Sequence, residues 1–80
     1  MKPGDVVFIQ WRDSTSIYGW KDRDEAKEKT TEGPLVCDAV GFLVSETQGH
    51  ICLCAQKTPH QVADLTIVPK ESIVRKRVLK

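Results

Sequence analysis

The chain has 80 residues, of which 40% are hydrophobic and 29% charged, and its net charge is +1. This composition predicts a single globular domain spanning residues 1–80 and argues against a disordered chain. A chain of this length buries only about 60% of its unfolded surface, so its core has little room for an internal active site. The small net charge argues neither for nor against a polyanionic partner.

The three cysteines, Cys37, Cys52 and Cys54, are a poor disulfide framework because their number is odd. We therefore expect reduced thiols and an intracellular setting. No apolar run approaches the ~20 residues of a membrane span. The N-terminal residues 1–5 lack the apolar stretch of a signal peptide. A cytoplasmic protein without membrane contact is the expectation.

A first strand is predicted over residues 5–11, which are rich in β-branched and aromatic side chains. Trp11 is expected to fill part of the core. In the polar segment that follows, Asp13 and Ser14 are turn formers, and Gly19 is a breaker suited to a positive φ. The segment therefore predicts an irregular connection between two regular elements.

A short helix is predicted over residues 21–30. Asp22 is its expected N-cap, with Glu25 completing a capping box, and Glu25 and Lys29 form a favourable i,i+4 pair. Only Ala26 is apolar in this segment, so the helix has no stripe with which to join a core. We expect it to be solvated and marginally stable.

Further strands are predicted over residues 35–46, 50–56, 64–68 and 74–79, with a single 3₁₀ turn at residues 70–73. Their order predicts a mainly β fold. The expected architecture is a small, five-stranded, partly open barrel of the Src homology 3 or Sm-like type, with one short inserted helix.

One predicted strand alternates cleanly, with Ile51, Leu53 and Ala55 on one face and His50, Cys52 and Cys54 on the other. With His60 or Cys37 nearby, the second face offers zinc-ligating side chains. However, the C-x-C spacing is not that of structural zinc sites, and same-face strand residues splay apart. We expect packing cysteines and no bound metal.

The chain resembles a group of small proteins carried by phages, prophages and other mobile elements. The resemblance spans most of the chain and rests on four short segments: Trp11-Arg-Asp-Ser14, Gly19-Trp20, Val40-Gly-Phe-Leu43 and Val68-Pro-Lys-Glu-Ser-Ile73. It implies a mobile element or its bacterial host as the setting, and it implies no mechanism.

A recognition loop is the first candidate function. Tyr18 and Trp20 are amphipathic rings of the type that anchors protein interfaces, with Asp13 and Ser14 as polar neighbours. The alternative is structural, with Asp13 and Ser14 as turn caps and the rings as packing residues. For Asp13 and Ser14 the structural alternative is favoured, whereas for Tyr18 and Trp20 both remain open. An unknown protein partner or self-association would follow from the first interpretation.

The basic end is the second candidate. From Lys70 to Lys80 there are five basic residues against one acidic residue. Arg75, Lys76, Arg77 and Lys80 are placed to contact the phosphates of a nucleic acid, with Tyr18 or Trp20 as a stacking platform. The alternative, which we favour, is an edge strand whose charges prevent edge-to-edge pairing.

An enzyme is not expected. Ser14, a histidine (His50 or His60) and an aspartate (Asp13 or Asp22) form a triad on paper, but triads are defined by geometry. The sequence contains no phosphate-cradling glycine loop. We therefore expect a non-enzymatic interaction or accessory module with no cofactor and no small-molecule substrate, and nucleic-acid binding is the alternative.

Overall fold

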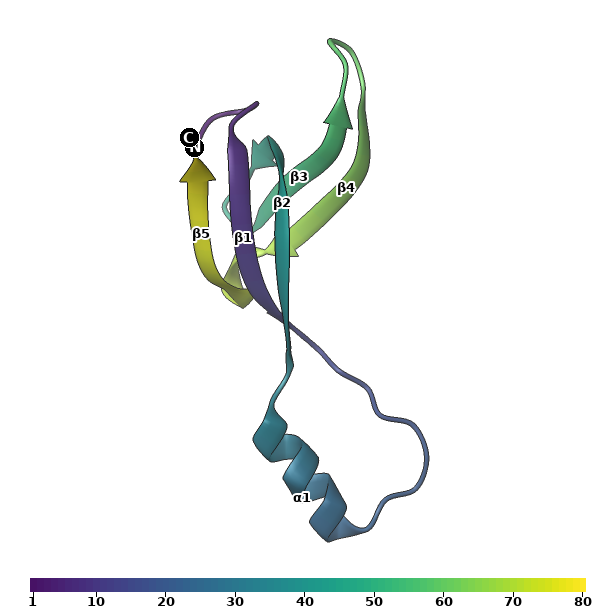
Figure 1. The fold of residues 1–80 in the computed structure, drawn as a ribbon. Helices are drawn as coiled ribbons and strands as arrows, with labels where there is room; N and C mark the ends of the chain where they lie inside the picture. The colour runs from purple at the N-terminus through teal and green to yellow at the C-terminus, as the bar shows by residue number, and fades with distance from the viewer.

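The computed structural model describes residues 1–80 and contains five strands, one α-helix and one 3₁₀ turn (Figure 1). In chain order these are β1 (Val6–Asp13), α1 (Arg23–Glu32), β2 (Leu35–Glu46), β3 (His50–Lys57), β4 (Val62–Pro69), η1 (Lys70–Ser72) and β5 (Ile73–Leu79). The strands form one antiparallel sheet in the order β4-β3-β2-β1-β5. The predicted mainly β fold with one short helix is confirmed.

The sheet is not closed. β4 and β5 are joined by η1, yet they lie at opposite ends of the strand order and are each hydrogen-bonded on one side only. β2 links the two halves because its residues 35–42 pair with β1 and its residues 42–46 pair with β3. A register shift between Leu43 and Ser45 marks the bulge that separates these two halves. The structure is therefore a bent open sheet rather than a complete barrel.

The core lies on one face of this bent sheet, which we call the inner face. Its central cluster of buried side chains comes from three strands: Val7, Ile9, Leu43, Ile51 and Leu53. Val68 of β4, opposite Ile51, is buried on the same face. Trp11 is half-buried and packs against this cluster together with Ile73 and Val78. Trp11 therefore contributes to the core as expected, although it does not fill the core alone.

Gly41 of β2 lies close against the backbone of β3. A Cβ added to Gly41 would lie 2.8 Å from the carbonyl oxygen of Cys54 and 3.1 Å from Cβ of Leu53. No other residue type fits this gap without moving the backbone. Gly41 therefore permits a close approach of the β2 backbone to β3.

The predicted element boundaries hold within about two residues, which is the usual uncertainty of element ends. β4 begins at Val62, two residues before its predicted start. Asp64 lies inside this strand with a φ of 58°, a left-handed conformation that aspartate tolerates better than most residues. That local reversal hid the first residues of β4 from a pattern-based prediction.

Residues 14–34 form an arm that projects from the far ends of β1 and β2 (Figure 1). Every residue from 12 to 36 is exposed, and α1 contains no buried side chain. The arm makes the molecule elongated, with principal extents of 53, 22 and 21 Å. The expectation of a solvated helix is confirmed. No helix of the structure has the length and apolar content needed to cross a bilayer.

Two details of the helix differ from expectation. Asp22 is the N-cap residue, but its side chain makes no capping hydrogen bond, so the predicted capping box with Glu25 is absent. Lys29 pairs with Glu32 at 3.6 Å rather than with Glu25. Exposed ion pairs at i,i+3 and i,i+4 differ little in energy, so the spacing in the sequence does not decide which glutamate Lys29 contacts.

Candidate interaction surfaces

The aromatic residues of the arm are its most unusual feature. Tyr18 is 88% exposed and Trp20 is 101% exposed, and Ile17 beside them is also exposed. Gly19 between the rings has a φ of 97°, which directs the chain away from the strand pattern and which glycine adopts without strain. Of the two interpretations left open for Tyr18 and Trp20, the exposures rule out packing residues, because both rings lie outside the core.

Asp13 and Ser14 lie at the base of the arm. The backbone N–H of Ser14 donates to the Asp13 carboxylate at 2.9 Å, and the N–H of Leu35 donates to the Thr15 hydroxyl at 3.1 Å. Asp13 is also directly opposite Leu35 in the ladder between β1 and β2. These contacts support the structural interpretation, in which Asp13 and Ser14 fix where the arm leaves the sheet.

The basic end forms the edge strand β5, and the pairing with β1 divides its charges between two faces. Residues directly opposite each other project from the same face of a sheet. Lys76 is opposite the buried Ile9 and therefore belongs to the inner face. Arg77 is opposite Phe8 and Arg75 is opposite Gln10, so both belong to the other face, which we call the outer face.

Lys76 is held in an ion pair, whereas the two arginines are not. Its Nζ lies 3.6 Å from Oε2 of Glu46 at the end of β2, and Nζ of Lys70 lies 2.8 Å from the same oxygen. The hydrogen bond from Lys70, reinforced by the charges of both lysines, holds the pKa of Glu46 below its ordinary value of 4.5. Arg75 and Arg77 are exposed and have no carboxylate partner.

The predicted stacking platform is not where nucleic-acid binding would need it. Tyr18 and Trp20 belong to the arm, which leaves the opposite end of the sheet from the C-terminal end of β5 (Figure 1). The ring beside the arginines is instead Phe8, which is half-buried opposite Arg77. A basic site on β5 would therefore use Phe8 in the role expected for Tyr18 or Trp20.

The outer face also carries an apolar row that crosses every strand. The register places one member on each strand, in sheet order Leu65, Cys54, Phe42, Val6 and Leu79. Leu65 is 52% exposed, whereas Cys54 in the second position is buried. Val40 and Ile67, which are both exposed, lie in the neighbouring rows. Sequence reasoning missed this row because it depends on the register of four strand pairs.

A partial signal for the row is present in the sequence. In β2 the residues of both faces are apolar, since Val40 and Phe42 alternate with Gly41 and Leu43. A strand with only one buried face reads as alternating apolar and polar residues. Apolar residues on both faces therefore indicate that the outer face of β2 is also covered or available for contact.

The cysteines are unpaired, as expected for reduced thiols. The register confirms that Cys52 and Cys54 share one face, opposite that of Ile51 and Leu53. Cys54 is buried beside Gly41, and Cys52 is half-buried. The structure brings no three His, Cys, Asp or Glu side chains into a group that could hold a metal ion. His50, which was considered as a ligand, instead lies 3.4 Å from the Thr47 hydroxyl through its Nδ1.

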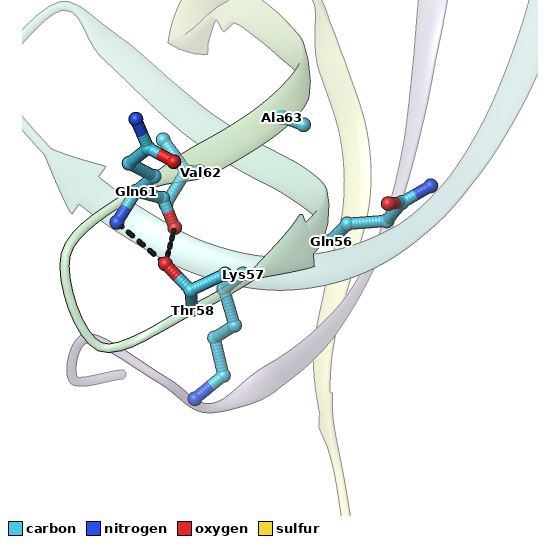
Figure 2. Close-up of a pocket in the computed structure, with 6 residues that line it drawn as sticks. All are labelled: Gln56, Lys57, Thr58, Gln61, Val62 and Ala63. Atoms are coloured by element: carbon cyan, nitrogen blue, oxygen red, sulfur yellow. Dashed lines mark hydrogen bonds between the residues drawn. The ribbon is translucent and has the colours of Figure 1, made fainter.

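An open depression of about 420 Å³ lies at the tip of the hairpin between β3 and β4 (Figure 2). Thr58 closes the turn, because its hydroxyl accepts from the N–H of Gln61 at 2.9 Å. Lys57 is the one ionisable side chain among the residues that line the depression, and its Nζ lies 5.2 Å from the ring centroid of Phe42. Four polar side chains and the apolar Val62 and Ala63 line this hollow.

Comparison with known proteins gives no match to a family model, a curated protein or a solved structure. The geometry of the arm, of β5 and of the outer face therefore carries the functional argument.

Proposed function

We propose that the chain is a non-enzymatic binding module that contacts another protein chain through its arm. The observation that carries this proposal is the complete exposure of Trp20 and the near-complete exposure of Tyr18. Large aromatic side chains are enriched at the centres of protein interfaces, where each buries about 150–250 Å². An arm that presents two of them outside the core has the composition of a binding element.

The lack of packing around α1 also supports this proposal. Isolated helices shorter than about 12–15 residues are marginal in water, and α1 has 10 residues with none buried. The arm therefore gains order when a partner covers it, and its aromatic residues supply the contact area that the helix itself lacks.

We also propose the setting and the finer architecture. The resemblance to small proteins of phages and other mobile elements supports such an element or its bacterial host, and the reduced thiols favour the cytoplasm. The strand order and the 3₁₀ turn between β4 and β5 support an Src homology 3 or Sm-like barrel that has opened along its β4 and β5 edges.

The arm is tested by site-specific photocrosslinking in the organism that encodes the chain. A photoreactive amino acid replaces Tyr18, and the control position is the exposed Thr58 in the hairpin between β3 and β4. We expect protein adducts from position 18 that Trp20→Ala removes, and none from position 58. The melting temperature of Trp20→Ala should equal that of the wild type. No adduct from position 18, or a Trp20→Ala variant that fails to fold, would refute the proposal.

Nucleic-acid binding through β5 is the second candidate, because Arg75 and Arg77 are exposed and unpaired beside Phe8. Anisotropy of a labelled single-stranded oligonucleotide over a range of salt concentrations tests it. If β5 binds phosphates, Arg75→Gln/Arg77→Gln lowers the affinity and reduces the salt slope by about 1.4. Lys76→Gln is the matched control, since Lys76 is already paired with Glu46. Equal affinities of all three proteins would exclude this candidate.

A further inference from the structure

We infer that the partner of the arm is a second copy of this chain, and that each arm docks on the outer face of the other copy at the apolar row. The inference rests on the proposed function of the arm and names its occupant. Two surfaces carry it: the exposed segment Ile17–Trp20, and the apolar row of the outer face, in which Leu65 is 52% exposed while Phe42 and Val6 are partly exposed.

The two surfaces cannot meet within one chain. The row crosses β1 at its first residue, Val6, whereas the arm leaves β1 after its last residue, Asp13. At the rise of an extended strand these positions are about 23 Å apart. The arm then continues away from the sheet rather than folding back over it (Figure 1). An arm that reaches this row must therefore come from another molecule.

The areas match what a stable dimer needs. Two aromatic rings on one arm offer about 400 Å² for burial. A two-fold pair contains two such arms and two covered faces, which gives about 1,600 Å² in total, the size of a standard specific interface. A reciprocal exchange is also closed, since each copy gives one arm and receives one, and so it produces a dimer rather than a fibre.

The charges of the two parts are opposite in sign. Residues 14–34 contain five acidic and four basic residues, whereas the rest of the chain contains eight basic and six acidic residues. The unpaired Arg77 lies on the outer face one row from the apolar row, and Asp24 and Glu25 follow Trp20 in the first turn of α1. Opposite charges beside an apolar contact orient the two copies and raise the rate at which they associate.

Sedimentation equilibrium of the full chain over a range of concentrations tests this arrangement. The wild type should form dimers. The arm variant Tyr18→Ala/Trp20→Ala and the face variant Leu65→Lys should each raise the dissociation constant at least tenfold. The matched control is Val62→Lys on the same strand, because Val62 is 46% exposed and pairs with Lys57 near the hairpin tip, outside the apolar row. This control should dimerise as the wild type does.

Mixing the two variants distinguishes arm-on-face docking from the other symmetric contacts. The face variant has an intact arm and the arm variant has an intact face, so their mixture should recover hetero-association through one contact. A face variant that still dimerises would indicate arm-on-arm pairing, and an arm variant that still dimerises would indicate face-on-face pairing; either result overturns the inference.

The same measurements separate this inference from the proposed function. A wild type that stays monomeric at all concentrations, while position 18 crosslinks to a different protein, overturns the second copy as occupant and leaves the arm as a binding element. A wild type that stays monomeric with no crosslink from position 18 overturns both. Crosslinks from position 18 between two copies of the chain, lost in Leu65→Lys and kept in Val62→Lys, support both.

Discussion

Lys76 and Glu46 form an ion pair across strands that are not neighbours in the sheet. Lys76 lies on β5 and Glu46 at the end of β2, with β1 between these strands in the sheet order, yet their charged atoms are 3.6 Å apart. The contact requires the part of β2 that pairs with β3, residues 42–46, to bend over the inner face. The pair, together with Lys70, therefore spans the side of the sheet that the strands themselves leave open.

This ion pair predicts an acid-sensitive contribution to stability. Because the folded state lowers the pKa of Glu46, its contribution is complete above the unfolded value of about 4.5 and is lost as the pH falls through the lower folded value. Urea denaturation between pH 7 and pH 3 should therefore show a weaker acid loss in Glu46→Gln than in the wild type. Glu71→Gln is the control, since Glu71 is exposed and has no ion pair. Identical pH profiles for Glu46→Gln and the wild type would contradict the assignment.

Gly41→Ala should destabilise the fold by about 1–3 kcal/mol, as other insertions into close-packed sites do. The added methyl group would meet the carbonyl oxygen of Cys54 at 2.8 Å, so β2 and β3 must separate. Gly49→Ala is the control, because nothing lies within 4 Å of its Cβ position. The free energies of unfolding from urea titrations check the difference. A Gly41→Ala variant as stable as Gly49→Ala would show that the strands separate without cost.

The amides of α1 should exchange with solvent much faster than those of β3. The helix has no buried side chain, whereas Ile51 and Leu53 of β3 are in the core. Segments with little buried apolar surface open at low free energy, and core strands open only with the whole domain. Hydrogen exchange followed by mass spectrometry or NMR measures both. Equal protection at a concentration where the chain is monomeric would mean that α1 has a packing partner within its own chain.

Cys52→Ala/Cys54→Ala should remain folded and lose about 1–3 kcal/mol of stability, which is the cost of trimming small buried groups. Most of the loss should come from Cys54, because it is buried while Cys52 is half-buried. The single variants measured by thermal denaturation separate the two contributions. Stoichiometric zinc in the purified wild type, lost together with the fold in the double variant, would instead make the thiols metal ligands.

The strands and the helix were predictable because their signals are local. Residues 35–46 were assigned correctly from apolar residues of one parity, and Gly33 ends α1 with a φ of 78° as a helix-terminating glycine does. Gly19, predicted as a breaker with a positive φ, has a φ of 97°. Each of these predictions depends on neighbours within a few residues along the chain.

The strand order of the sheet and the apolar row were not predictable, because they depend on how strands align. The row forms because Phe42 lies opposite both Val6 and Cys54. A shift of one residue in either register would move one of these partners to the other face. Likewise, Lys76 lies on the inner face whereas Arg75 and Arg77 lie on the outer face. A run of basic residues in the sequence does not reveal this division.

The projecting arm also determines how the molecule moves through water. A compact chain of this length has a radius of gyration of about 12 Å, whereas the value here is 16.2 Å. Drag on such a rod-like particle exceeds that on a sphere of equal mass, so a monomer elutes early from a size-exclusion column calibrated with globular standards. Two copies that lie antiparallel, each with its arm along the other, would add mass while adding little length. The frictional ratio should therefore fall on association, and sedimentation velocity reads that ratio directly.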